Sequence, residues 1–158
     1  MKAGPALGAQ GRYHRLAPLV AETYDLPLMT RLAVGGDWTK ATPAEQDALV
    51  KAFSRLTTAS YAHNFDHFGG ERFTVDAAPR MRATDKFVQS HLTPASGAPV
   101  SLLYRMRESG GLWKVIDVYY DGVSQLTLRR SDFTASLNQG GPKALVAHLD
   151  SLTAKLLQ

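Results

Sequence analysis

Residues 100–121 read VSLLYRMRESGGLWKVIDVYYD, which is two largely apolar segments joined by Ser109-Gly110-Gly111. A short glycine-containing connection between two such segments is typical of a β-hairpin. With a three-residue loop, Glu108 lies opposite Leu112 and alternate residues of both strands share one apolar face. That face would comprise Val100, Leu102, Tyr104, Met106, Lys114, Ile116, Val118 and Tyr120. We therefore expect an antiparallel hairpin with one buried face.

The same alternation occurs before this hairpin. Apolar and polar residues alternate over 71–76, 84–92 and 99–107, while 112–121 is more apolar throughout. The turn-rich segment 93–99 separates two of these strands. The pattern predicts a four-stranded, curved antiparallel sheet in which consecutive strands are neighbours.

Helices are predicted on either side of the strands. A long one begins with the N-cap Thr42, Pro43 at the first helical position and Glu45, which completes a capping box, and it extends to about Phe65. Its apolar arc is wider than the roughly 100° of a helix that lies on one core, which indicates several neighbours or an enclosed ligand. Apolar residues at helical spacing predict four further helices, over 12–24, 25–34, 123–137 and 142–156.

Length and composition agree with a single domain over residues 1–158, of the α+β class, with helices packed on one face of the sheet. The chain has 44% apolar residues and no cysteine, which excludes thiol catalysis, disulfides and thiolate metal sites. No segment approaches the roughly 18 apolar residues of a membrane span, and no signal peptide is visible at the N-terminus.

The formal charge of +4 is dispersed. The tight basic clusters are Arg80–Arg82, Arg105–Arg107 and Arg129–Arg130, and each falls in a different predicted element. A nucleic-acid-binding protein usually gathers its basic residues on one face. We therefore expect no nucleic-acid partner.

No catalytic or metal-binding motif is evident. His63 and His67 have the i, i+4 spacing of metal ligands, but Asn64 stands where a zinc protease has glutamate, and a capping role near the helix end is the alternative. The GxSxG motif and a dinucleotide-binding loop are both missing from the sequence. We expect no catalytic residues, no metal and no cofactor.

Asp117 is the one residue whose position suggests a catalytic role. It lies in an otherwise apolar strand, where a carboxylate is costly unless it is paired. An ion pair with Arg105 or Arg130 is one interpretation. A general base with a raised pKa in a pocket is the other.

Several motifs resemble the MlaC family of periplasmic phospholipid-binding proteins, also called the toluene-tolerance family. They are Asp25–Gly35 followed by Trp38, Thr42–Gln46 at the start of the long helix, Trp113–Val118, Asp121–Ser124 and Arg130–Phe133. The segments 115–119, 61–65 and 70–73 are most similar to the hopanoid-associated HpnM branch.

The resemblance implies a periplasmic carrier rather than an enzyme, with an NTF2-like fold and an apolar pocket between sheet and helices. Its cargo would be a phospholipid or a hopanoid, moved between an inner-membrane transporter complex and outer-membrane lipoprotein or porin components. Family members begin with a signal peptide and a further helix, so the resemblance implies that both would precede residue 1.

From the faces that converge, we predict a lipid-binding pocket between the helices and the sheet. Its lining would be Leu28, Leu32, Leu49, Phe53, Leu56, Tyr61, Leu102, Tyr104, Ile116 and Val118, with Lys114, Arg129 and Arg130 near the head group. The alternative is that these residues simply form the core of an interaction module. A second alternative is a small-molecule isomerase or dehydratase that uses Asp117.

Overall fold

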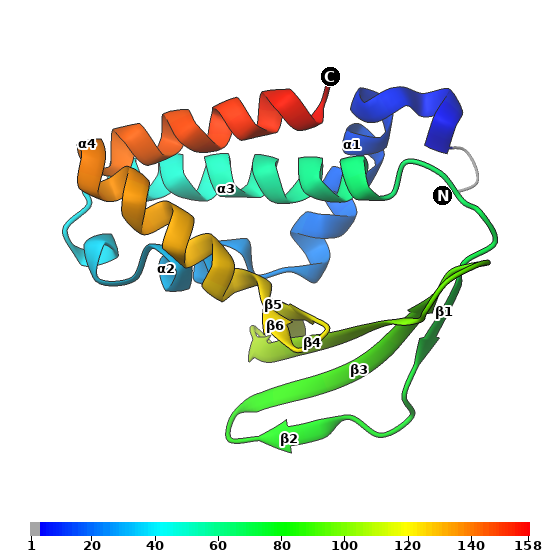
Figure 1. The fold of residues 1–158 in the computed structure, drawn as a ribbon. Coiled ribbons are helices and arrows are strands. Elements are labelled where there is room, and N and C mark those ends of the chain that lie inside the picture. The colour runs from blue at the N-terminus through cyan, green and yellow to red at the C-terminus, as the bar shows by residue number, and fades with distance from the viewer. Residues whose placement is uncertain (1–3) are drawn as a thin grey trace.

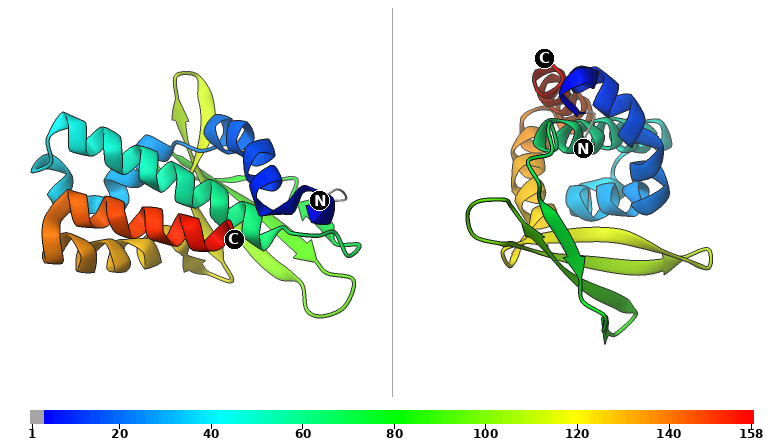
Figure 2. Two further views of the ribbon diagram at one scale, coloured as in Figure 1. Left: turned by 90° about the horizontal axis from the view of Figure 1, so that it is seen from above. Right: turned by 90° about the vertical axis from the view of Figure 1, so that its right-hand side faces the viewer.

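A computed structural model describes residues 4–158 as a layer of helices over one face of a sheet (Figure 1). The helices are α1 (Gly4–Thr23), α2 (Leu26–Val34), the 3-10 helix η1 (Gly35–Thr39), α3 (Pro43–Asn64) and α4 (Gln125–Leu156). The strands are β1 (Arg72–Val75), β2 (Arg80–Arg82), β3 (Asp85–Thr93), β4 (Val100–Ser109), β5 (Leu112–Tyr120) and β6 (Val123–Ser124). Two further views show the helices on the same side of the twisted strands (Figure 2).

The predicted starts of α2 and α3 are confirmed, whereas α1 begins at Gly4 rather than at the predicted Arg12. The hydroxyl of Thr42 accepts a hydrogen bond from the backbone N–H of Glu45, and the Glu45 carboxylate accepts one from the backbone N–H of Thr42 at 2.9 Å. The carboxylate of Asp25 accepts a hydrogen bond from the N–H of Leu28 at 3.0 Å and caps α2. Each cap satisfies backbone donors that a helix leaves free at its first turn.

The C-terminal helices differ from the prediction at their start. Residues 123–124 form the short strand β6, so α4 begins two residues after the predicted start. The predicted break at Gly140-Gly141 is confirmed, because both glycines leave helical geometry at a kink that separates two helical arms of α4. The second arm returns along α3, and Arg55 of α3 binds Asp150 of this arm at 2.6 Å.

The sheet has six strands rather than four. Its order is β1-β3-β4-β5-β6, and β2 pairs with β3 along the same edge as β1. The prediction missed β2 and β6 because alternation is not detectable over three and two residues. The four predicted strands are present, and the strand pairs are antiparallel.

The β4–β5 hairpin has a different register from the one predicted. Its loop is Gly110-Gly111 alone, with φ of 59° and 80°, so Ser109 pairs with Leu112. Farther along, Arg105 pairs with Asp117 and Met106 with Val115, so Ile116 is the extra residue of a β-bulge.

The apolar sheet face survives this change of register at the far end of the hairpin. Leu102 pairs with Tyr120 and Tyr104 with Val118, a shift of two residues from the prediction that leaves each side chain on its predicted face. Lys114 pairs with Arg107 instead of joining this face.

The core lies within the helical layer and against the start of β5. Its fully buried large side chains include Leu49, Leu56, Ile116, Phe133, Leu145 and Leu149. The rings of Phe53 and Phe133 meet edge to face between α3 and α4. Among the described residues, no helix combines the length and apolarity needed to cross a membrane.

Candidate functional site

A cavity of about 560 Å³ lies between α3 and the sheet. The C-terminal half of α3 forms one wall, with Phe53, Leu56, Thr57, Ser60, Tyr61 and Asn64, continued by Phe65. Strands β3, β4 and β5 form the opposite wall, with Leu92, Val100, Leu102, Tyr104, Val118 and Tyr120. The sides are Tyr24, Met29, Asp117, Gln125, Leu126 and Arg129.

Helix α3 contributes both to the core and to the cavity wall. Leu49 and Ala52, in its first half, are completely buried among the helices. In its second half, the half-buried Tyr61 and the exposed Asn64 line the cavity over the strands. The wide apolar arc of α3 therefore serves both the core and the cavity, as a wide arc allows.

Three tyrosines place hydroxyl groups in this apolar space. The hydroxyls of Tyr24 and Tyr61 share a short hydrogen bond. Burial raises the pKa of both, and it raises the pKa of Tyr104 to about 12. The hydroxyls therefore stay neutral at physiological pH and add polar contacts without charge.

Arg129 is the cation of the cavity wall. Its Nη2 donates to the hydroxyl of Ser60 at 3.5 Å, which links α4 to α3. Tyr120 lies on the strand side of the cavity with 49% of its surface exposed. An anionic group beside Arg129 would meet its guanidinium.

Six of the ten predicted lining residues do line the cavity. They are Phe53, Leu56, Tyr61, Leu102, Tyr104 and Val118. The other four are Leu28, Leu32, Leu49 and Ile116, and they are not among the residues that line it. Lipid contact at any of these residues stays a prediction.

The positions of the other four residues outside the cavity lining have physical explanations. Ile116 is the bulged residue of β5 and, like Leu49, is completely buried in the core. On α2, Met29 lines the cavity, whereas Leu32 lies elsewhere on the helix and is 37% exposed. Leu28 packs against the core and is partly buried.

Of the three cations predicted near a head group, only Arg129 lines the cavity. Arg130, the next residue of α4, packs against Gly35 at the end of α2, where an added Cβ would lie 3.2 Å from its Nη2. Lys114 pairs with Arg107 near the hairpin turn, away from the cavity.

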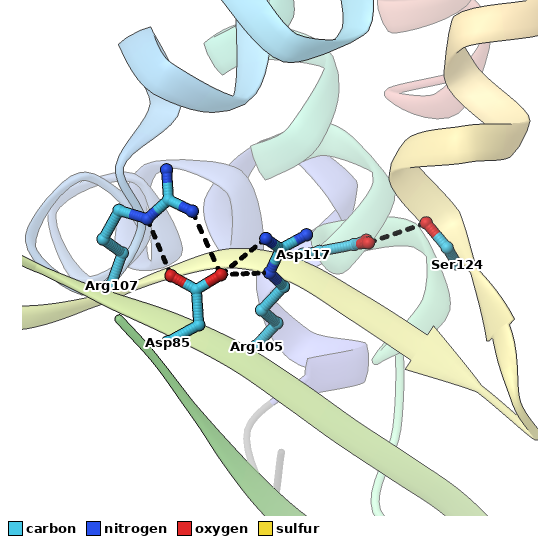
Figure 3. Close-up of polar contacts among 5 residues, drawn as sticks. All are labelled: Asp85, Arg105, Arg107, Asp117 and Ser124. Atoms are coloured by element: carbon cyan, nitrogen blue, oxygen red, sulfur yellow. Dashed lines mark hydrogen bonds and ion pairs between the residues drawn. The ribbon is translucent and has the colours of Figure 1, made fainter. Parts of the chain in front are cut away.

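Asp117 caps α4 instead of forming the predicted ion pair. One carboxylate oxygen accepts from the Ser124 hydroxyl at 2.7 Å and the other from the N–H of Leu126 at 3.1 Å. The nearby Arg105 binds Asp85 (Figure 3). A carboxylate at a helix N-terminus compensates its own burial through these donors and the helix dipole.

Local sequence signals also exist for some lining residues outside the predicted set. Val100 and Tyr120 lie on the predicted apolar face, and Leu126 lies on the predicted apolar stripe of α4. Tyr24 is held beside the sheet by a parallel β-bridge to Val115. This contact joins residues far apart in the sequence, so no local pattern predicts it.

The histidines do not assemble a metal site. His67 binds the carboxylate of Asp66 at 2.5 Å near the end of α3. Within residues 4–158, no group of three or more metal-ligating side chains gathers.

Known proteins share both the sequence pattern and the fold. The family model described as MlaC protein matches residues 1–151. The toluene tolerance protein ttg2D of Pseudomonas putida is 26% identical over 102 residues, 65% of this chain and 47% of that protein. The intermembrane phospholipid transport system binding protein MlaC of Haemophilus influenzae is 25% identical over 119 residues, 72% of this chain and 56% of that protein.

The chain thus spans about half the length of these curated relatives. A solved structure of a phospholipid-binding protein from Ralstonia solanacearum, in complex with a phospholipid, has a TM-score of 0.85 and 27% identity to this chain. The match covers 99% of this chain and 90% of that one. Sequence and fold agree: the chain belongs to the MlaC family.

Proposed function

We propose that this protein binds a phospholipid through its acyl chains in the cavity between α3 and the sheet. We also propose that it carries the lipid through the periplasm between the inner and outer membranes. The observation that carries the proposal is the cavity itself, whose walls include the apolar side chains of Phe53, Leu56, Leu102 and Val118. The family and the phospholipid-bound relative from Ralstonia solanacearum support it.

The energetics favour carriage without covalent chemistry. Each methylene group moved from water into an apolar site contributes about 0.8 kcal/mol. A cavity that takes up most of one acyl chain therefore competes with the bilayer for that chain. The neutral tyrosine hydroxyls and Arg129 would remain for the polar part of the lipid.

The environment of Asp117 favours a carrier over an enzyme. The carboxylate considered as a general base is 3% exposed, and both of its oxygens accept hydrogen bonds that start α4. An effective base needs a free oxygen within reach of a substrate proton.

The partners and the lipid class are further parts of the proposal. The family suggests an inner-membrane transporter complex and outer-membrane lipoprotein or porin components as donor and acceptor. The segment 115–119 resembles the hopanoid-associated branch, which makes a polycyclic terpenoid the second candidate cargo.

Native mass spectrometry of protein purified from a lipid-containing bacterial host tests the proposal, with lipidomics of the extracted ligand. We expect a one-to-one complex with a two-chain phospholipid in the wild type and its loss in Leu102→Trp, which fills the cavity. Leu128→Trp is the control, because Leu128 is 52% exposed on α4 and does not line the cavity. Lipid-free wild-type protein, or equal lipid content in both variants, would contradict the proposal.

A further inference from the structure

The sheet face opposite the cavity carries a cluster of arginines. In the registers of β2, β3 and β4, Arg82, Asp85 and Arg107 form one cross-strand row, and Arg80, Phe87 and Arg105 form the next on the same face. Tyr104, which lines the cavity, neighbours Arg105 on β4, so alternation places the arginines on the other side of the sheet. Two of the basic clusters that are separate in the sequence thus lie together.

Asp85 holds two of these arginines in place. Its carboxylate is 6% exposed and accepts from Nε of Arg105 at 2.6 Å and from Nε of Arg107 at 2.7 Å, with Nη2 of each arginine as a second donor (Figure 3). The arginine side chains remain 33% and 35% exposed. Among residues 4–158, no acceptor engages the Nη1 of either guanidinium, so each presents fixed, unused donors.

The cluster has more positive than negative charge. Arg80 and Arg82 are exposed, and in the described part of the chain no carboxylate lies within ion-pair distance of either. Of these four arginines, Arg105 and Arg107 form ion pairs, and both pairs are with Asp85. Arg82, Asp85, Phe87, Arg105, Arg107 and Tyr119 take part in lining a hollow of about 330 Å³ there. A preorganised set of arginines loses little side-chain entropy when it binds a carboxylate.

We propose that this face docks an acidic surface of a partner protein, whose aspartate or glutamate side chains enter the hollow and bind the arginines. We name the cluster of Arg80, Arg82, Arg105 and Arg107 the arginine face. The choice of a protein over a bilayer rests on the proposed carrier function. A membrane bound to the arginine face would lie on the side of the sheet opposite the cavity, whereas a docked protein leaves the cavity free to exchange lipid.

Binding of the full chain to immobilised poly-L-glutamate, measured by biolayer interferometry, tests the docking surface. We expect Arg80→Gln/Arg82→Gln to weaken binding roughly tenfold, as the loss of two partly exposed charge pairs implies. Raised salt should weaken wild-type binding. The matched control is Arg15→Gln/Lys155→Gln, which removes two exposed charges from α1 and α4 and should change binding less than about twofold.

Parallel measurements separate the other sources of negative charge. The proposal is overturned if the control variant loses as much affinity as Arg80→Gln/Arg82→Gln. It is also overturned if phosphatidylglycerol–phosphatidylcholine vesicles, a single-stranded oligonucleotide or inorganic phosphate bind the arginine face more tightly than poly-L-glutamate does. Native mass spectrometry of both double variants should show unchanged lipid content, so a failure of docking is distinguishable from a failure of lipid binding.

Discussion

Arg105 and Asp117 lie directly opposite each other on β4 and β5, yet they do not form an ion pair. Arg105 binds the carboxylate of Asp85 on the other neighbouring strand, and Asp117 accepts hydrogen bonds from Ser124 and Leu126. Each charge of the facing pair therefore has a separate structural role. Arg105 contributes to the arginine face, and Asp117 accepts hydrogen bonds at the N-terminus of α4, the helix that carries Arg129.

The cap formed by Asp117 should be measurable as stability. Asp117→Ala removes both acceptors and leaves the N–H of Leu126 without its partner, so we expect the free energy of unfolding to fall by about 2 kcal/mol. Urea denaturation followed by circular dichroism measures this loss. Asp132→Asn, which changes an exposed carboxylate of α4, should alter stability by less than about 0.5 kcal/mol. Equal effects in the two variants would contradict the capping role.

Asp85 should make stability depend on acidic pH. Hydrogen bonds and charge from Arg107 and Arg105 hold its pKa below the usual 3.8. Because the folded pKa is the lower one, the stabilisation is complete above the unfolded value and is lost as pH falls through the folded value. Below about pH 4, wild-type stability should therefore fall more steeply than that of Asp85→Asn. Urea denaturation of both proteins across this range gives the comparison, and parallel curves would refute the prediction.

The hydroxyl of Tyr104 should ionise at a higher pH than the hydroxyl of an exposed tyrosine. Burial raises its pKa to about 12, whereas an exposed phenol ionises near pH 10. The absorbance difference at about 295 nm between wild type and Tyr104→Phe isolates this one group. The raised pKa also predicts that its stabilising contribution is complete below the unfolded value and is lost as pH rises toward 12. A midpoint near 10 in the difference titration would show that Tyr104 is accessible to solvent.

Arg129 and Arg130 offer a matched test of head-group contact. Only Arg129 lines the cavity, while Arg130 packs against Gly35. We expect Arg129→Gln to reduce the uptake of phosphatidylglycerol relative to phosphatidylcholine about threefold to tenfold, the size of one partly exposed charge-assisted contact. Native mass spectrometry after incubation with mixed vesicles measures this ratio. In Arg130→Gln the ratio should remain that of the wild type, and the reverse pattern would place the head group elsewhere.

Local signals predict the helices well because their caps are local chemistry. Thr42 and Glu45 satisfy each other's backbone N–H groups within one turn, and the Asp25 carboxylate accepts from the N–H of Leu28 at the start of α2. The lining residues Leu102, Tyr104 and Val118 are predictable because strand alternation is also local, and a register error of two residues does not change the face.

The predictions are wrong where the structure depends on contacts between segments that are distant in the sequence. Nothing near Ile116 in the sequence announces a bulge, which depends on how β5 meets β4 and the Tyr24 bridge together. Likewise, the role of Asp85 emerges only when β3 places it between Arg82 and Arg107. The choice of Asp85 over Asp117 as the partner of Arg105 is a property of the assembled sheet.

The bulge at Ile116 divides β5 into two stretches with different surroundings. On the turn side, Val115 and Ile116 are packed in the core, and on the other side Val118 and Tyr120 border the cavity. Substitutions at Val118 and Tyr120 can therefore reshape the binding space while the residues that hold the fold together stay unchanged. A strand divided in this way allows the lining of the cavity to vary during evolution while the core is retained.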